Sequence, residues 1–414
     1  MSGRPSAERV IGAVSTVAYL TNQYPAPSHS FIRREIRALE SLGWAVRRFS
    51  HRRVCAPLVD IADQDEAQLT CVLLDSSPQI FLAAFWHWLR TGPWRTLRTL
   101  AYGFAHARTG DRRWRAHLGY FGLACVLSRR LQQLGFPHLH VHFGTNASDV
   151  ACLCRQLCGL TYSMTWHGPH EFDEPNRLNL ADKIAGASFV VLVSDAGHET
   201  TRTRYRESAA KLKTIRCGLD TSWFALPTTA IPRAARLVCV ARLDDQKNPL
   251  LLIDAAALLV ARGQRFVLTM AGDGALRAHV ERRIAEHQLE ACVTVAGWCT
   301  QQEVIRHLQE SRALVLSSHD EGLPVAVMES FAVGRVAIAP NVGAVHELVE
   351  TGVTGWLVAA QDPTALADAM QACLNASPEY LQGLAANAKQ RVQAHRIEVA
   401  AAMLAEAFLR VSSA

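Results

Sequence analysis

Apolar and polar residues follow one another along this chain in a pattern that predicts alternating strands and helices. In the first half, apolar runs of β type lead through a loop to residues at helical spacing, as in a predicted helix carrying Phe31, Ile32, Ile36 and Leu39. The β-type runs cover residues 10–19, 44–49, 139–143, 162–166 and 189–193. Such strand–loop–helix–strand units call for a parallel sheet, so the sequence predicts an α/β fold.

The second half repeats the alternation more regularly. Its predicted strands cover residues 236–241, 266–271, 293–296 and 313–317, and predicted helices cover 249–262 and 275–287. Thr300 and Glu303 have the spacing of a helix capping box. The Pro- and Thr-containing segment 217–233 predicts a linker between two doubly wound domains. Residues 1–225 and 226–395 would then face each other across a cleft, which is where such folds bind ligands.

Composition sets the broad class of the protein. The chain has 414 residues, of which 49% are hydrophobic, and this is enough for two cores. No run of about 20 apolar residues lacks charges, so neither a spanning helix nor a secretory signal is predicted. The eleven cysteines are scattered among apolar neighbours. The one cluster, Cys152, Cys154 and Cys158, is predicted to pack on a helix face rather than to bind zinc. This usage indicates the reducing cytoplasm.

Positive charge is concentrated in the segment 81–133, which is predicted to be mainly helical. A single acid, Asp111, accompanies nine arginines and four tryptophans there. These are Arg90, Arg95, Arg98, Arg108, Arg112, Arg113, Arg115, Arg129 and Arg130, with Trp86, Trp88, Trp94 and Trp114. Arginine attracts anionic headgroups and indole settles at the apolar–polar boundary, which favours an anionic membrane surface over a merely solvated basic face. No module for binding RNA or DNA surrounds the segment, so no nucleic-acid partner is predicted.

The strongest group of candidate residues lies in Glu321-Gly-Leu-Pro-Val-Ala-Val-Met-Glu329, directly after the predicted strand 313–317. Pro324 suits the first turn of a helix, which places Glu321 at the end of the strand and Glu329 between one and two turns into the helix. Gly322 lets a ligand approach the backbone, and free amides at the helix start suit a diphosphate. The two carboxylates then suit hydroxyls of a sugar and a ribose. Acids that complement the helix dipole would explain Glu321 alone.

Two loops in the same half add charge and a tight turn. Arg242 and Lys247 follow the first strand, where two cations can neutralise a diphosphate without a metal, although a solvated loop would have a similar composition. Gly272 and Asp273 belong to a Gly-Asp-Gly turn after the second strand, a sequence that many turns share.

Taken in order, these segments resemble the family 4 retaining glycosyltransferases of the GT-B fold. That family has Gly-Arg-Leu…Lys-Asn, for which this chain has Ala241 in place of the glycine, then Gly-Asp-Gly, a Gly-hydrophobic pair at Gly297 and Trp298, and Glu-x7-Glu. The resemblance implies two Rossmann-like domains, with a C-terminal helix in residues 396–414 that packs back on the N-terminal domain.

The resemblance also implies a role for each matched residue. The implied donor site consists of Arg242, Lys247, Gly272, Asp273, Gly297, Trp298, Gly322, Leu323 and Glu329. Within it, Arg242 and Lys247 would bind the diphosphate, Glu329 the ribose, and the loop at Gly297 and Trp298 would lie beside the nucleobase. Glu321 would contact hydroxyls of the transferred sugar near the reacting carbon.

The N-terminal half resembles a subgroup of that family that acts in bacterial exopolysaccharide assembly, of the colanic-acid type. The matching segments are Ser28-His-Ser-Phe-Ile-Arg-Arg-Glu35, His140-Val-His-Phe143, Thr165-Trp-His-Gly168 and Cys217-Gly-Leu-Asp220. By this resemblance His167 joins Glu321 as a catalytic candidate that would contact the sugar or the departing phosphate. Ser28, His142 and Asn146 are further acceptor or cleft candidates. Pro25, Pro27 and Ser28 replace the glycine-rich first loop of many relatives.

The activity that the resemblance implies is transfer of a hexose from a nucleoside-diphosphate sugar, a UDP-sugar before a GDP-sugar, with retention and without a metal or other cofactor. The acceptor would be a glycan or a polyprenyl-linked oligosaccharide, which would place the protein peripherally on the inner face of the cytoplasmic membrane. Two alternatives remain open. One is another enzyme of this architecture, such as an epimerase or a phosphorylase, and the other is a non-catalytic scaffold subunit that binds the sugar nucleotide.

Overall fold

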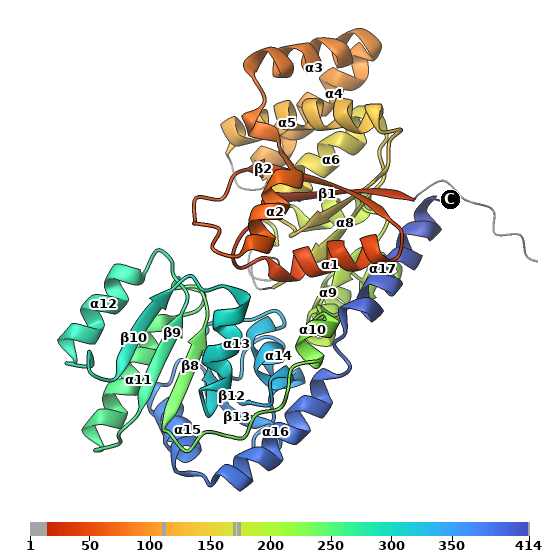
Figure 1. Cartoon of the computed structure of the whole chain (residues 1–414). Helices are drawn as coiled ribbons and strands as arrows, with labels where there is room; N and C mark the ends of the chain where they lie inside the picture. The colour runs from red at the N-terminus through yellow and green to blue at the C-terminus, as the bar shows by residue number, and fades with distance from the viewer. Residues whose placement is uncertain (1–14, 110–112, 169–170, 172–174, 413–414) are drawn as a thin grey trace, which may run out of the picture.

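The computed structural model describes residues 15–109, 113–168, 171 and 175–412, and these build two parallel sheets (Figure 1). The strand order is β3-β2-β1-β4-β5-β6-β7 in the first sheet and β10-β9-β8-β11-β12-β13 in the second. In each sheet the chain moves outward on one side of the first strand and then on the other, which is the doubly wound arrangement. The predicted α/β fold class is therefore confirmed.

The strands are short and unevenly spaced along the chain. The first sheet contains β1 (Thr16–Gln23), β2 (Ala45–Arg52), β3 (Thr70–Val72), β4 (His138–His142), β5 (Tyr162–Trp166), β6 (Val190–Leu192) and β7 (Leu212–Thr214). The second contains β8 (Arg236–Val240), β9 (Val267–Ala271), β10 (Val293–Gly297), β11 (Ala313–Val315), β12 (Val336–Pro340) and β13 (Gly355–Val358).

Helices cover both faces of each sheet. The N-terminal half carries α1 (Ser30–Ser41), α2 (Ile61–Leu69), α3 (Pro78–Thr91), α4 (Pro93–Thr109), α5 (Trp114–Gln133), α6 (Asn146–Cys158), α8 (Leu180–Gly186), α9 (Asp195–Arg204) and α10 (Thr221–Phe224). The remaining helices are α11 (Pro249–Ala261), α12 (Arg277–Glu286), α13 (Gln301–Gln309), α14 (Val325–Ala332), α15 (Pro363–Asn375), α16 (Pro378–Val392) and α17 (Ile397–Ser412). Short 3₁₀ turns lie at Leu73–Asp75, Arg206–Lys211 and Val345–Glu347.

Central strands are buried because helices pack on both of their faces. All five residues of β5 are buried, and so are all five of β12. β12 is accordingly a continuous apolar run, whereas β5 alternates and carries Ser163 and Thr165, whose hydroxyls contact the ring of His140. On one face of the first sheet, α5 and α6 form a core in which Cys152 and Cys154 pack as small apolar side chains. No helix in the described parts of the chain is both long and apolar enough to span a bilayer.

The last helix lies on the first sheet although it follows the second in the chain (Figure 1). α17 packs against α1 and β4, and Phe408 contacts Trp44 with ring centroids 5.6 Å apart. The two chain segments that connect the halves are themselves joined: the Leu219 N–H donates to the carbonyl of His395, and the Ile397 N–H donates to the carbonyl of Leu219. Gly218 permits this approach, because a Cβ there would lie 2.5 Å from the Ile397 nitrogen.

Most predicted elements appear within a few residues of their expected bounds. The capping box at Thr300 and Glu303 is formed in both directions. The first strand extends farther than predicted, since β1 runs from Thr16 as far as Gln23, and the predicted residues 10–14 lie outside the described residues. Pro324 is not within the first turn as predicted but is the N-cap of α14, because its ψ of 107° is extended rather than helical.

Candidate functional site

A cleft lies between the carboxyl ends of the two sheets, at the edge where loops from both halves meet. Many of the residues singled out from the sequence line it. They are Ser28, His167, Arg242, Lys247, Gly272, Trp298, Glu321, Gly322, Leu323 and Glu329. Loops that follow parallel strands emerge at the same edge of a sheet, which is why motifs far apart in sequence converge here.

Lys247 and Glu321 form the central ion pair of the cleft. Nζ of Lys247 lies 2.7 Å from both carboxylate oxygens of Glu321, and the Ser318 hydroxyl donates to Oε1 of Glu321 at 2.6 Å. Glu321 is only 5% exposed, so its charge depends on these partners. Because the ammonium group is half-buried and fixed by the carboxylate, it forms a preorganised cation at the start of α14.

Arg242 is held by its own loop. Its Nε donates to Asp244 at 2.6 Å and its Nη2 to Gln246 at 2.9 Å. Gln246 in turn donates to the carbonyl of Asp320, which ties this loop to the loop before α14. These contacts orient Arg242 beside Lys247. They do not fully neutralise the positive charge of Arg242, since its side chain remains about one-third exposed.

Glu329 faces the other half of the molecule. Nη2 of Arg34, on α1, donates to Oε1 of Glu329 at 2.7 Å, and Arg34 also lies over the ring of Trp223. Arg34 is buried, and its Nε and Nη1 have no hydrogen-bond partner among the described residues. Sequence analysis missed Arg34, although it belongs to the Ser28–Glu35 segment that was noted.

His167 follows β5 and contributes its ring to the cleft from the N-terminal half. Phe31 and Phe143 contact it, with ring centroids 4.5 and 4.9 Å away. Burial, followed by the neighbouring His142 and His29, lowers the pKa of His167 well below its usual value, so the ring is neutral near pH 7. His167 is therefore suited to a hydrogen-bonding role rather than to a fixed cationic one.

His29 is a second cleft histidine that sequence analysis did not single out. Its Nδ1 lies 3.0 Å from the carbonyl oxygen of Gln23, and burial, followed by the charge of Arg242, lowers its pKa to about 4. Its position in the loop after β1, at the edge of the sheet where ligands bind, could have identified His29 as a candidate from sequence. Glu171 also lines the cleft, accepts the Gly144 N–H at 2.9 Å, and has a pKa raised to about 7 by burial.

Two loops touch across the cleft at Gly322. A Cβ added to Gly322 would lie 1.7 Å from the carbonyl oxygen of His167, and a Cβ on Gly168 would lie 3.4 Å from the Gly322 nitrogen. Gly272 is similarly close to the carbonyl oxygen of Ala241, at 1.8 Å. These contacts need glycine because any side chain would occupy space that backbone already fills.

Four predicted residues do not line the cleft. Asp273 accepts the Gly274 N–H at 2.8 Å and pairs with Arg277 at 2.7 Å, which is a turn-stabilising role. Gly297 ends β10 with φ +78°. His142 is fully buried behind His167, and Asn146 begins α6. The absence of these four from the lining refers to the described residues alone.

Comparison with known proteins gives a consistent result. Residues 229–391 match the family described as Glycosyl transferases group 1. Over 166 residues the chain is 35% identical to the amylovoran biosynthesis glycosyltransferase AmsK of Erwinia amylovora, covering 38% of this chain and 41% of AmsK. Over 190 residues it is 30% identical to the putative colanic acid biosynthesis glycosyltransferase WcaL of Escherichia coli strain K12, covering 44% of this chain and 47% of WcaL. The chain thus spans less than half the length of these two curated relatives.

A solved structure shares nearly the whole fold. The crystal structure of Anabaena Alr3699/HepE in complex with UDP and glucose superposes with a TM-score of 0.70 at 16% identity, covering 97% of this chain and 100% of that one. At this identity the likeness concerns the fold alone, and it confirms the predicted GT-B architecture.

Proposed function

We propose, from the premise that residues 229–391 belong to the glycosyl transferases group 1 family, that this protein transfers a hexose from a nucleoside-diphosphate sugar to a glycan or lipid-linked oligosaccharide. The observation that carries the proposal is the meeting of Arg242, Lys247, Glu321 and His167 in one cleft. Cations beside a leaving diphosphate, and hydrogen-bonding groups beside a sugar, are what cleavage of a sugar–phosphate bond needs. The likeness to AmsK and WcaL supports a role in bacterial exopolysaccharide or cell-surface polysaccharide synthesis.

The proposed donor site lies within residues 226–395, and the proposed acceptor site lies within residues 1–225. The C-terminal helix within 396–414, α17, packs against α1 and β4 of the acceptor half. Arg242, Lys247 and the amides at the start of α14 would bind the diphosphate. Glu329 would share its carboxylate between Arg34 and the ribose hydroxyls, and Glu321 would contact the sugar. Trp298 would lie beside the nucleobase, for which uridine is the first choice, guanosine the second. The HepE complex with UDP supports that order.

The proposed chemistry retains the configuration of the reacting carbon by front-face attack. The bond from this carbon to the phosphate oxygen breaks, the acceptor oxygen bonds to the same face, and the acceptor proton passes to the leaving phosphate. Retaining glycosidases instead use two carboxylates about 5–5.5 Å apart, one as nucleophile. Glu329 does not suit that role because it is paired with Arg34. Two cations and the backbone amides at the start of α14 would stabilise the negative charge of the leaving diphosphate. The proposed reaction therefore needs no metal or other cofactor.

Substitution of Glu329 by alanine tests this donor site. We expect UDP to bind the wild-type protein more tightly than GDP, ADP or TDP in calorimetry. Glu329→Ala should weaken UDP binding by about tenfold or more, because a hydrogen bond to a charged group contributes about 1.5–3 kcal/mol. Glu406→Ala, an exposed carboxylate paired with Arg410 on α17, is the matched control and should bind as the wild type does.

The outcomes of that experiment separate the candidate functions. If none of the four diphosphates binds the wild type, the proposed donor site is wrong. If UDP binds but the protein does not hydrolyse any UDP-sugar in the absence of acceptor, and transfers none to added glycans, the scaffold function replaces the enzymatic one. If Glu329→Ala and wild type bind UDP with equal affinity, the proposed contact between Glu329 and the ribose is wrong.

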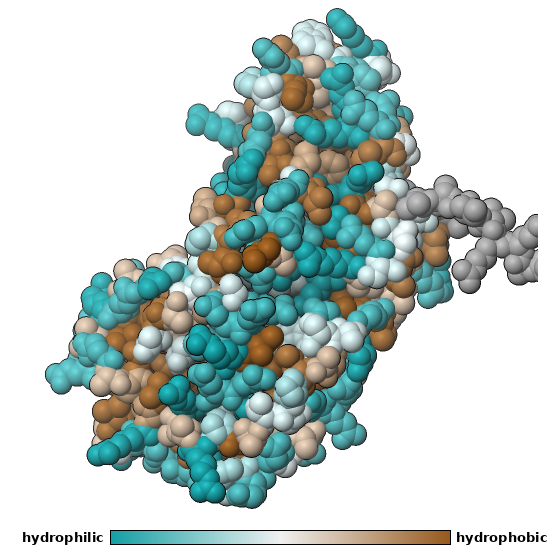
Figure 2. All heavy atoms as spheres, in the orientation of Figure 1, coloured by the Kyte–Doolittle hydropathy of each residue, from teal (hydrophilic) through white to brown (hydrophobic). Residues whose placement is uncertain are grey.

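The outer helices α3, α4 and α5 form a surface suited to a membrane. Trp86, Trp94 and Trp114 are exposed there, Trp94 by 79%, whereas Trp88 is buried and donates its indole N–H to the carbonyl of Cys125. Figure 2 shows apolar side chains scattered among polar ones over these helices at the top of the view. Exposed apolar side chains include Ile80, Leu82, Leu97, Phe104 and Leu118. Arg112 lies outside the described residues. We propose that this surface holds the protein on the anionic inner face of the cytoplasmic membrane.

Binding of the protein to lipid vesicles tests this proposal directly. Vesicles containing anionic lipid should bind the protein more strongly than neutral ones, and added salt should weaken that binding. Replacing Arg90, Arg95 and Arg98 by glutamine should lower partitioning by about 10²-fold, at about 1 kcal/mol per basic residue. Replacing exposed Arg202, Arg282 and Arg410 is the control and should change little. Equal binding to neutral and anionic vesicles would exclude the proposal.

A further inference from the structure

Three side chains of the N-terminal half form a path of close polar contacts that ends in the cleft. Glu35, on α1, has its Oε1 3.2 Å from Nε2 of His142, on β4. Nδ1 of His142 lies 2.8 Å from Nε2 of His167, and the planes of the two rings are inclined by only 18°. Glu35 also accepts the hydroxyl of Tyr19 at 2.7 Å. The path therefore joins a carboxylate beneath the sheet edge to the cleft through two imidazole rings.

The partners of each atom decide where the protons lie. Nε2 of His142 contacts Glu35 as an ion pair, without the alignment of a hydrogen bond, and a carboxylate oxygen this close favours the proton on Nε2. With that single proton on His142, its Nδ1 can only accept, so Nε2 of His167 carries the proton between the two rings. Nδ1 of His167 is left as an acceptor. Its neighbour there is the thiol of Cys217, 3.9 Å away, and Cys217 also lines the cleft.

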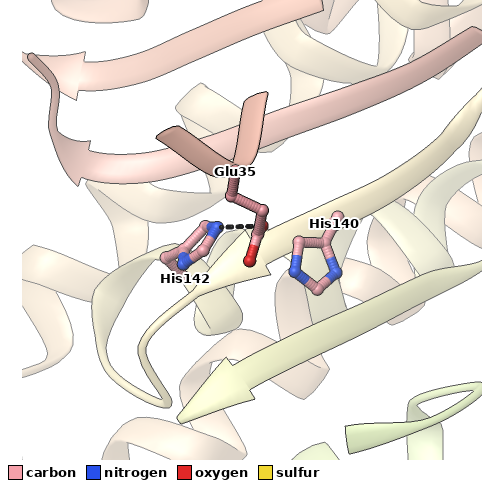
Figure 3. A group of neighbouring side chains, drawn as sticks. All are labelled: Glu35, His140 and His142. Carbon is pink, nitrogen blue, oxygen red and sulfur yellow. Dashed lines mark ion pairs between the residues drawn. The ribbon is translucent and has the colours of Figure 1, made fainter. Parts of the chain in front are cut away.

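A metal ion is the competing explanation for the same residues. Glu35, His140 and His142 lie close together (Figure 3). One ligand atom of each lies within 4.8 Å of the others. The two nitrogens of His140, however, already lie 2.8 Å from the Ser163 hydroxyl and 2.9 Å from the Thr165 hydroxyl. A ring held by hydroxyls on both sides has no lone pair directed at an ion between Glu35 and His142. The path to His167 accounts for more of the contacts than a metal does.

We infer that Glu35 and His142 are positioning residues that fix His167 in the tautomer with a protonated Nε2, so that its Nδ1 accepts a hydrogen bond from a hydroxyl of the bound sugar. The identity of that ligand rests on the function proposed above, but the tautomer does not. The arrangement follows the logic of a buried acid that orients a catalytic imidazole, with a second histidine placed between acid and cleft. His167 acts on the sugar as an acceptor and does not donate to the diphosphate.

Nitrogen NMR of the whole protein, labelled with ¹⁵N-histidine, reads the tautomers without any ligand. His142→Gln and His167→Gln identify the two sets of signals. At pH 7.5 we expect a protonated, pyrrole-type Nε2 and an unprotonated, pyridine-type Nδ1 for both residues. In Glu35→Gln, whose amide can donate as well as accept, His142 and His167 should lose this one-sided pattern, while Glu40→Gln on the same helix should leave it unchanged.

Several results would overturn the inference. A protonated Nδ1 on His167 in the wild type would do so, and this measurement stands even if Glu35→Gln fails to fold. Signals that are identical in wild type and a folded Glu35→Gln would do so as well. A change in the signals on adding EDTA or Zn²⁺ would favour the metal site. Failure of UDP to bind would refute the donor site but would leave the tautomer result intact.

Discussion

Replacing Lys247 by methionine is expected to lower turnover of the donor by about 10²–10³-fold, the usual cost of removing one preorganised charge from a site where negative charge develops. The ammonium group already lies 2.7 Å from both oxygens of Glu321, at the start of α14 where the diphosphate is proposed to bind. Methionine keeps much of the length and apolar character of the stem but cannot neutralise a leaving diphosphate. The measurement is release of UDP from a UDP-sugar, the proposed donor.

The same substitution should also destabilise the fold, since it leaves Glu321 as a buried carboxylate with only neutral partners. Breaking a buried ion pair on one side costs about 3–5 kcal/mol. The double variant Lys247→Met, Glu321→Gln should recover most of the lost melting temperature and none of the lost turnover. Lys389→Met, at a half-buried lysine that contacts Thr228 away from the cleft, is the control. Recovery of turnover in the double variant would contradict the role assigned to Lys247.

A single methyl group at Gly322 should separate the two halves of the cleft. A Cβ there would lie 1.7 Å from the carbonyl oxygen of His167, roughly half of an ordinary contact distance, so the loops must move apart by more than about 1 Å. Displacements of this size at a reacting centre can cost about 10²-fold in rate. Gly322→Ala is therefore expected to lose at least that much donor turnover, while UDP, which is proposed to bind mainly to the second half, loses less affinity.

Two measurements accompany that substitution. Small-angle scattering should show a larger radius of gyration for Gly322→Ala than for wild type, because the halves are held apart. Gly383→Ala, within α16 where no atom lies within 4 Å of the added Cβ, is the matched control and should keep both turnover and shape. Wild-type turnover in Gly322→Ala would show that the loops need not touch during the reaction.

Local patterns predicted much of the fold because local forces determine those elements. β5 was predicted at its observed bounds because Tyr162, Met164 and Trp166 alternate with two hydroxyl residues, which is the two-residue period of a strand. The helix at Thr300 was predicted from its capping box, which is formed by neighbours in sequence. The end of β1 shows the limit, because the strand continues to Gln23, beyond the predicted end at Tyr19, and its pairing with β2 extends as far as that residue.

Some residues of the candidate site could likewise be predicted from local sequence, and others could not. Arg242, Lys247 and Glu321 could be found from sequence because the first two follow β8, the third follows β11, and both strands open on one edge of the sheet. Arg34 and Glu35 could not be assigned roles, since their partners are contributed by distant segments: Arg34 meets Glu329 across 295 positions in the chain. Helical periodicity identifies the apolar face of α1 but gives no information on where its buried charged side chains find their partners.

The hydrogen-bonded crossing at Leu219 and Arg396 has a consequence for protein engineering. Because α17 packs on the first half, the second half, which is proposed to bind the donor, is topologically an insertion within it. The chain enters the second half near Gly218 and leaves it near Ile397. An exchange of donor specificity between related enzymes therefore requires two junctions, and these lie side by side in space. A chimera joined at one point alone would transplant a foreign α17 onto α1 and Trp44. If such a chimera failed to fold or to work, the cause would be the mismatched contacts of α17 and not an incompatibility between the two halves in catalysis.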